Sequence, residues 1–136
     1  MMRHKKQLRI SPKDLGIDGI AGNATTSSSW VDCTGYSKAT LMFKFVANSS
    51  ATSAAMTFNL QVSSDGGSTA HTLQTEATSG GTVTLVDKLY SHATDNANAE
   101  FAVTFDVNCE LLRVFGLAVA SGHSGETYTA TMLLST

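Results

Sequence analysis

The sequence predicts an all-β protein, a single antiparallel β-sandwich of the jelly-roll or immunoglobulin-like type. Apolar and polar residues alternate in several runs, most clearly over residues 56–63 and 101–108, and this period of two is typical of a strand with one buried face. Short turns rich in Gly, Asn, Asp and Ser separate the runs. Because these connections are too short for crossover helices, we expect antiparallel pairing.

Length and composition favour one domain with a weakly charged surface. The chain has 136 residues, which is enough to bury about two-thirds of the unfolded surface in a single core. We expect an N-terminal arm with a connecting segment over residues 1–22 and the sandwich domain over residues 23–136. Charged residues are only 15% of the chain, whereas Ser and Thr supply about a quarter. Such a surface does little to keep copies apart, so self-association is favoured.

The first expected elements lie between residues 14 and 46. Residues 14–22 contain too many glycines for a helix, so we expect an irregular segment whose apolar side chains pack onto the domain. Residues 30–33 read as a short strand that a turn closes. Residues 38–46 form a longer strand with apolar residues on both faces, which indicates burial on both sides or a subunit contact.

The middle of the chain contains a strand, a sharp turn and two weaker strands. Residues 56–63 form the clearest strand, and Asp65-Gly66-Gly67 reverses the chain because glycine adopts positive φ without steric cost. Residues 71–76 are a weak edge strand that ends in a second reversal at Gly80-Gly81. Residues 82–90 follow as a strand of the sandwich, and a bulge near Asp87 would explain its position on an apolar face.

Three strands complete the expected sandwich. Residues 101–107 alternate cleanly, residues 111–120 are apolar on both faces except at Arg113, and residues 127–134 alternate again. β-Branched and aromatic residues occupy the inward positions, so propensity agrees with pattern. The predicted core consists of Phe43, Phe45, Phe58, Leu60, Val62, Phe101, Val103, Phe105, Val114, Tyr128 and Met132.

The basic residues are concentrated at the N-terminus. Five of the nine precede the first acidic residue, Asp14, so residues 14–136 carry four bases against eleven acids. The basic arm is either a solvated tail, mobile in the free protein, or a segment that docks on an acidic neighbour. Nucleic acid is a weaker interpretation because no aromatic or Gly-Arg interleaving accompanies the charges. The expected partner-binding residues of the arm are Arg3, Lys5, Lys6, Leu8, Arg9 and Ile10.

Hydropathy and cysteine usage indicate synthesis in a cytosol. No apolar run approaches the roughly 18–20 residues of a membrane span, so we expect no membrane partner. Polar residues at Ser11, Pro12 and Lys13 interrupt the stretch that would follow the basic residues of a signal peptide. Under cytosolic conditions, Cys33 and Cys109 are expected to be two free buried thiols rather than a disulfide.

Residues that could carry chemistry are scattered. None of the four histidines has a second ligand-type residue at metal-binding spacing. Residues 121–125, Ser-Gly-His-Ser-Gly, lack the strand-to-helix context of a nucleophile elbow. Residues 95–100 contain Asp, Asn and Glu but lack the glycine and the residue order of a calcium-binding loop. We therefore predict no catalytic residue, no metal, no cofactor and no enzymatic activity.

Two aromatic residues remain candidates for recognition. Trp30 and Tyr36 flank Cys33 near the start of the sandwich. A tryptophan ring can stack on a sugar, as in carbohydrate-binding modules, but large aromatic side chains more commonly anchor a core or an interface. Both interpretations, interface anchor and sugar-stacking residue, stay open for Trp30 and Tyr36.

Two segments carry a resemblance. Residues 30–40 read Trp-Val-Asp-Cys-Thr-Gly-Tyr-Ser-Lys-Ala-Thr, and residues 63–68 read Ser-Ser-Asp-Gly-Gly-Ser. They resemble small β-sandwich virion proteins of tailed bacteriophages, in which a Trp-x-Asp-x-x-Gly-Tyr segment leads into the first sheet strand and a Ser-x-Asp-Gly-Gly turn follows the next. Cys33 stands where an aliphatic residue is more usual. The similarity covers residues 30–68, and the later strands match only in their spacing.

This resemblance implies a capsid decoration, or cement, protein. Such a protein would sit on the capsid surface of the virion, bind between subunits of the major capsid protein and stabilise the shell. It would form a homo-oligomer, with a trimer expected by analogy. The alternatives are a neck, tail or fibre component of the virion, or a carbohydrate-binding β-sandwich module that uses Trp30 or Tyr36.

Overall fold

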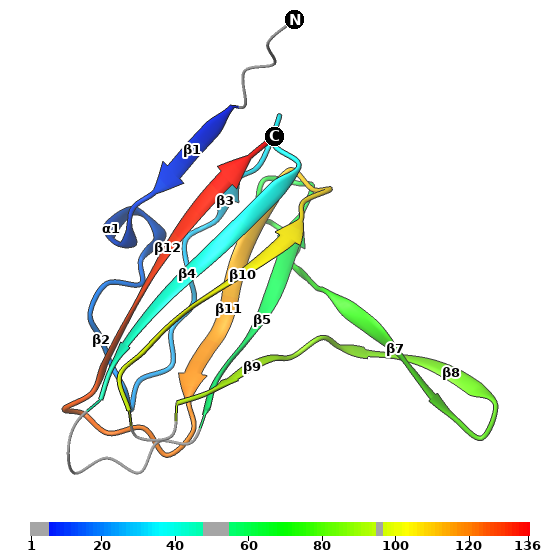
Figure 1. The fold of residues 1–136 in the computed structure, drawn as a ribbon. Coiled ribbons are helices and arrows are strands. Elements are labelled where there is room, and N and C mark those ends of the chain that lie inside the picture. The colour runs from blue at the N-terminus through cyan, green and yellow to red at the C-terminus, as the bar shows by residue number, and fades with distance from the viewer. Residues whose placement is uncertain (1–5, 48–54, 95–96) are drawn as a thin grey trace, which may run out of the picture.

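The structure is a computed structural model that describes residues 6–47, 55–94 and 97–136. Two antiparallel sheets lie face to face, and a hairpin extends from one side of them (Figure 1). The predicted all-β sandwich is therefore confirmed. The helix α1 (Pro12–Leu15) is a single turn, and its N-cap is Ser11, whose Oγ accepts a hydrogen bond from the Asp14 N–H at 3.2 Å.

Each large sheet contains five strands. The first has the order β1-β12-β4-β10, with β2 also paired to β12. Its strands are β1 (Gln7–Ile10), β2 (Ile20–Ala21), β4 (Lys38–Val46), β10 (Ala99–Asp106) and β12 (Thr127–Ser135). The second has the order β3-β11-β5-β6, with β9 also paired to β5. Its strands are β3 (Val31–Asp32), β5 (Ala55–Ser63), β6 (His71–Thr72), β9 (Tyr90–Ala93) and β11 (Leu111–Val119).

The pairing of early strands with late ones identifies the sandwich as a jelly roll. Strand β1 pairs with β12, β3 with β11, β4 with β10, and β5 with both β6 and β9. The first half of the chain thus pairs with the second half in reverse order, and successive pairs lie in alternate sheets. This is the double Greek key order of jelly rolls. In an immunoglobulin-like sandwich the first strand would pair with the second instead.

The core lies between the two sheets. Seven of the eleven predicted core residues are buried there, each with 3% or less of its surface exposed: Phe43, Phe45, Phe58, Leu60, Val114, Tyr128 and Met132. The other four pack against this core but are only half-buried: Val62, Phe101, Val103 and Phe105. Three of these lie on β10, which ends the first sheet. One flank of β10 therefore has no neighbouring strand among the described residues.

The N-terminal segment is part of the sandwich from Gln7 onward. All four residues of β1 pair with β12, and Leu8 lies opposite Leu134. Leu15 and Ile17, in and just after α1, are completely buried in the core. Residues on both sides of position 22 therefore contribute to the first sheet or to the core beside it.

Among the described residues, the predicted basic arm includes strand β1, which is paired with β12 over Gln7–Ile10. Residues 1–5, which include Arg3 and Lys5, lie outside the described residues. The short run of β1 is too polar to predict a strand by itself. It becomes one because β12 offers it an open row of backbone donors and acceptors, and backbone groups at a sheet need such partners.

The turn after β5 has the predicted geometry. Gly66 and Gly67 adopt φ values of +72° and +90°, which glycine tolerates without steric strain. One Asp65 carboxylate oxygen accepts hydrogen bonds from the Thr69 N–H and from Ser63 Oγ, each at 2.8 Å. These bonds, the ones from Thr69 above all, lower the pKa of Asp65 to about 2.

The hairpin is an insertion in an edge strand. Its strands β7 (Gln74–Ser79) and β8 (Thr82–Asp87) are joined by a tight turn at Gly80-Gly81, as predicted. Thr72 lies opposite Gln61 and Tyr90 lies opposite Phe58, so residues 73–89 stand against only the two β5 residues between Phe58 and Gln61. The predicted sandwich strand over residues 82–90 is therefore wrong, since most of it lies outside the sandwich.

Candidate functional site

The N-terminal strand and Tyr36 meet at one end of the sandwich. The Lys6 backbone forms two hydrogen bonds with Thr136: its N–H donates to the side-chain Oγ1 and its carbonyl accepts from the Thr136 N–H, both at 3.1 Å. The Lys6 Nζ lies 4.7 Å from the centre of the Tyr36 ring, which is a favourable distance for a cation over an aromatic face. The structure thus brings together Lys6 and Tyr36, two of the predicted site residues.

The remaining described residues of the predicted arm divide between core and surface. Ile10 packs against the core, whereas Leu8 is 43% exposed and Arg9 is exposed. Strand β1 is the last strand in the order of its sheet. Basic residues on an edge strand resist pairing with arbitrary strands, and here Lys6 and Arg9 are exposed beside and on β1.

Trp30 lies in a cluster on the outer face of the second sheet, which we name the Trp30–Arg113–Phe115 cluster. The Arg113 guanidinium carbon is 4.5 Å from the centre of the Trp30 ring and 5.3 Å from the centre of the Phe115 ring. Arg113 Nε donates a hydrogen bond of 2.8 Å to the Gln61 side-chain oxygen. The guanidinium is therefore fixed in place between two aromatic rings, an arrangement that favours a planar cation.

The β5 turn holds the edge of the Trp30 ring. A Cβ atom added at Gly67 would lie 2.8 Å from Trp30 Nε1, so the turn backbone already contacts the indole. Because Arg113 covers one face of the ring and Gly67 meets its edge, Trp30 acts as an anchor between turn and sheet. Tyr36 contacts Lys6 instead, so the two candidate aromatic residues belong to different surfaces.

Phe115 and Arg113 were missed as candidate site residues. Phe115 is 38% exposed, and it is the most accessible aromatic member of the cluster. A signal for both was present, because Arg113 is the only charged residue in the apolar run 111–119. A single charge in a strand that is apolar on both faces marks the face that is not in the core.

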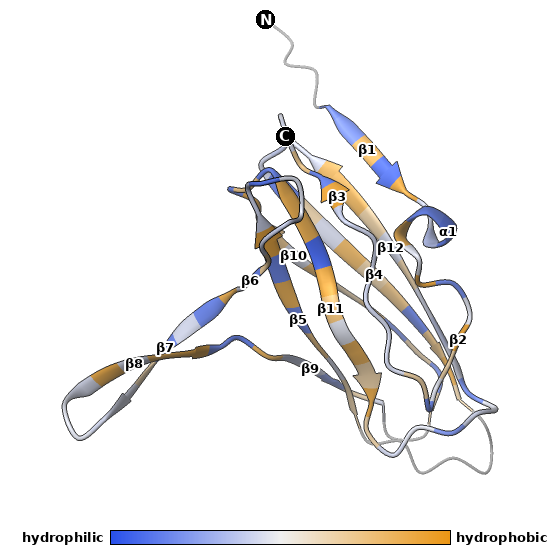
Figure 2. Ribbon diagram, turned by 180° about the vertical axis from the view of Figure 1, so that it is seen from behind, coloured by the Kyte–Doolittle hydropathy of each residue, from blue (hydrophilic) through white to orange (hydrophobic). Residues whose placement is uncertain are grey.

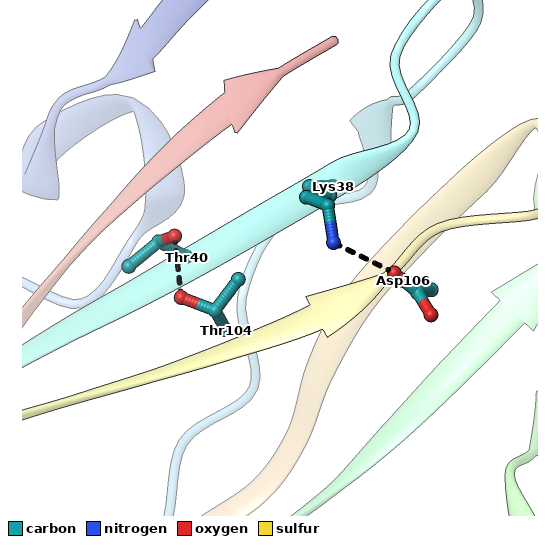
Figure 3. Close-up of polar contacts among 4 residues, drawn as sticks. All are labelled: Lys38, Thr40, Thr104 and Asp106. Atoms are coloured by element: carbon teal, nitrogen blue, oxygen red, sulfur yellow. Dashed lines mark hydrogen bonds and ion pairs between the residues drawn. The ribbon is translucent and has the colours of Figure 1, made fainter.

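The outer face of the first sheet is weakly charged and shallowly grooved. Between β4 and β10, Lys38 forms an ion pair of 3.2 Å with Asp106, and the hydroxyl groups of Thr40 and Thr104 are 2.9 Å apart (Figure 3). Farther along the same strands is a groove. It is lined by Met42, Phe43, Lys44, Glu100, Phe101, Ala102, Thr129 and Thr131. The apolar residues on the outer face of β4 therefore lie on the surface of the chain and not in its core.

The two cysteines line one hollow and are free thiols, as predicted. Cys33 is buried and Cys109 is half-buried. Burial raises the pKa of Cys33 to about 12, with a further contribution from the neighbouring Cys109, and burial also raises the pKa of Cys109. Since the thiolate is the reactive form, burial lowers the reactivity of both residues near neutral pH.

The described residues contain no group of three or more His, Cys, Asp or Glu side chains that could hold a metal ion. The buried carboxylate of Glu126 accepts a 2.7 Å hydrogen bond from the His123 N–H, so it fastens the turn before β12. Nor does the described part of the chain include a helix with the length and hydropathy to cross a membrane.

A comparison with protein-family models matched none of them, and a search of curated proteins also found no match. The fold and the surfaces described above therefore carry the evidence on function. Those surfaces combine aromatic rings, guanidinium and ammonium groups and exposed strand edges, which are features of macromolecular contact.

Proposed function

We propose that this chain is a structural virion protein of a tailed phage, a capsid decoration protein that binds between major capsid subunits and stabilises the shell as a homotrimer. The observation that supports this most is the jelly-roll order, in which β1 pairs with β12 and β5 pairs with β6 and β9. Jelly rolls recur in viral capsid proteins and in lectins. The resemblance of residues 30–68 to phage virion sandwiches favours the first of these classes.

The charge distribution supports a docking role for the β1 edge. Lys6 and Arg9 lie on or beside the edge strand, and Lys13 follows it in α1. The rest of the chain carries an excess of acidic residues. A local basic strip on an acidic body orients the protein toward acidic patches on a partner, and attraction between exposed charges weakens as salt rises.

The experiment is to add the purified protein back to isolated capsids that lack it. Stable binding and a higher capsid melting temperature are expected, with binding that weakens at high salt. The double substitution Lys6→Glu with Arg9→Glu should weaken binding strongly, whereas Lys44→Glu on the outer face of β4 serves as the matched control and should bind as the wild type does. Absence of binding to any capsid shell would contradict the proposal, and binding to isolated necks, tails or fibres would assign the chain to those structures instead.

A carbohydrate-binding module is the second candidate, because lectins share the jelly roll and Trp30 is only half-buried. The contact between Trp30 and Arg113 leaves less of the ring for a sugar than a free stacking residue would offer. A glycan array separates the candidates. Glycan binding that Trp30→Ala or Tyr36→Ala abolishes, in a protein without affinity for capsids, would establish the second candidate.

A further inference from the structure

The hairpin formed by β7 and β8 exposes apolar side chains far from the sandwich. Every residue of β8 is exposed, and Val83 and Leu85 are 57% and 65% exposed. Leu89, beside the hairpin base, is 61% exposed. Figure 2 shows hydrophobic residues along β8 while the hairpin points away from both sheets. An isolated two-stranded hairpin is marginally stable in water, so a partner surface would stabilise this one.

The two faces of the hairpin differ. Val83 lies opposite Thr78 and Leu85 lies opposite Glu76, so these four residues share one face. The other face carries Val86 and small uncharged residues. The first face, which we name the Leu85 face, therefore has the two most exposed apolar side chains of β8 and two acids, Glu76 beside Leu85 and Asp87 at the hairpin base.

The same insertion leaves an apolar strip open on the side of the sandwich, between β10 and the edge strand formed by β6 and β9. We name this strip the open side. One hollow in it is lined by Phe58, Tyr90, His92, Phe101 and Val103, and another by Val62, Leu73, Phe105, Cys109 and Leu112 together with the polar residues Asp106 and Asn108. Residues 73–89 leave the sheet between the two hollows, so the chain that would cover this strip is the chain that forms the hairpin.

We propose that the Leu85 face of the hairpin docks on the open side of a second copy of this chain. One insertion creates both an unpartnered apolar arm and an unpartnered apolar strip, and in a single copy the arm points away from the strip (Figure 1). Each surface has the chemistry that the other needs, because both are apolar with a polar border. This inference goes beyond the proposed virion role and does not depend on it.

The area of the docked face indicates a weak contact that is repeated around a closed ring. Each hairpin strand has six residues and so spans about 20 Å, and two strands are about 10 Å wide. One docked hairpin face thus removes about 400 Å² from water, counting both partners. A stable interface buries at least about 1,000 Å². In a closed ring each copy gives one hairpin and receives one, so each copy takes part in two such contacts, each of about 400 Å².

Charge complementarity points to the same contact. The acid directly opposite Leu85 on this face is Glu76, whereas Asp87 at the base is hydrogen-bonded to Gln74 within the hairpin. On the open side, the Lys88 ammonium lies 5.1 Å from the centre of the Tyr90 ring, and the His92 ring stacks on Phe101 at 3.8 Å. Lys88 thus places a positive charge at the border of the first hollow, where Glu76 of a docked copy would meet it.

The oligomeric mass tests the proposal by light scattering at micromolar concentrations. The wild-type chain should be an oligomer, and the double substitution Val83→Thr with Leu85→Thr should reduce it to a monomer with an unchanged circular dichroism spectrum. Val86→Thr is the matched control, since it makes a similar change on the other face and should leave the mass unaltered. A monomeric wild-type chain, or a doubly substituted chain with wild-type mass, would overturn the proposal.

A charge exchange tests the docking site itself. Glu76→Lys and Lys88→Glu should each raise the dissociation constant of the oligomer by about tenfold, and the combined variant should return it toward the wild-type value. The single variant with the higher dissociation constant is the reference. If the dissociation constant of the combined variant is at least as high, Glu76 does not meet Lys88, and the assignment of the open side would fail.

Discussion

Strands β12 and β10 belong to the same sheet and have the same alternation of residues, yet their inward side chains differ in burial. The inward residues of β12, Tyr128 among them, are completely buried, because β12 lies between β4 on one side and β1 and β2 on the other. The inward residues of β10, such as Phe105, are only half-buried. In β8 the alternation continues, but Leu85 is 65% exposed. Alternation therefore reports local conformation, and the neighbouring strands decide burial.

The largest expected effect is on the free energy of unfolding when a phenylalanine is removed from a strand inside the sheet or from β10 at its end. Phe45→Ala should lower the free energy of unfolding by about 3–5 kcal/mol, because it leaves a cavity in a packed core. Phe105→Ala should cost clearly less, since its ring is only half-buried, and Leu85→Ala should change the unfolding of the isolated chain by less than about 0.5 kcal/mol. Urea denaturation at low protein concentration measures all three. Equal costs for Phe45 and Phe105 would contradict the difference between β4 and β10.

Because Tyr128 on β12 is buried, the stability of the protein should also depend on alkaline pH. Burial raises the pKa of Tyr128 to about 12, above its ordinary value near 10. Below pH 10 the stabilisation is complete. As pH rises from 10 to 12 the unfolded tyrosine ionises while the folded one does not, so stability is lost. The loss is on the order of 2 kcal/mol, since one pKa unit corresponds to about 1.4 kcal/mol.

The alkaline loss can be assigned to Tyr128 with a matched variant. The Tyr128 hydroxyl donates to the Ala24 carbonyl at 2.6 Å, so Tyr128→Phe should lower stability near neutral pH. That variant should also lose less further stability between pH 10 and pH 12 than the wild type does. Unfolding free energies at several pH values provide the measurement, and parallel curves for the two proteins would contradict the assignment.

A smaller effect is expected where the β5 turn contacts Trp30. Gly67→Ala should destabilise the protein by about 1–3 kcal/mol, because its φ of +90° strains an alanine and the added Cβ would collide with Trp30 Nε1. Gly66→Ala is the control, since its φ is +72° with no atom within 4 Å of the added Cβ. In the control variant the backbone at position 66 should be strained, but Trp30 should not move. Trp30 fluorescence should therefore shift in the first variant alone, and equal spectra would contradict the contact.

The smallest effect is expected at the exposed β4–β10 border. Lys38→Ala removes the ion pair with Asp106, whose side chains are 56% and 76% exposed, respectively. Surface pairs of this kind contribute about 0–1 kcal/mol, so the unfolding free energy should change by no more than that and should depend little on salt. A loss above 2 kcal/mol would mean that this border is less solvated than the structure indicates.

The errors of sequence interpretation share a cause. The alternation over residues 82–90 predicted a strand correctly over β8, but it could not show that β8 pairs with β7 outside the sandwich. The four residues of β1, of which only Gln7 and Arg9 are polar, were predicted as part of an arm, because the partner that makes them a strand lies more than a hundred residues away in β12. Trp30 was recognised as a candidate, whereas Arg113 was not, since their contact joins distant segments.

The sequence by itself determined where most strands run and where the chain turns. Side-chain periodicity and the glycines at positions 66, 67, 80 and 81 act over a few residues, so a local pattern contains them. Only the tertiary structure decided that β1 joins β12, that the sandwich is a jelly roll and that residues 73–89 leave it. Strand pairing depends on closing long loops and on burying apolar area against particular neighbours, and these long-range terms are absent from any local stretch of sequence.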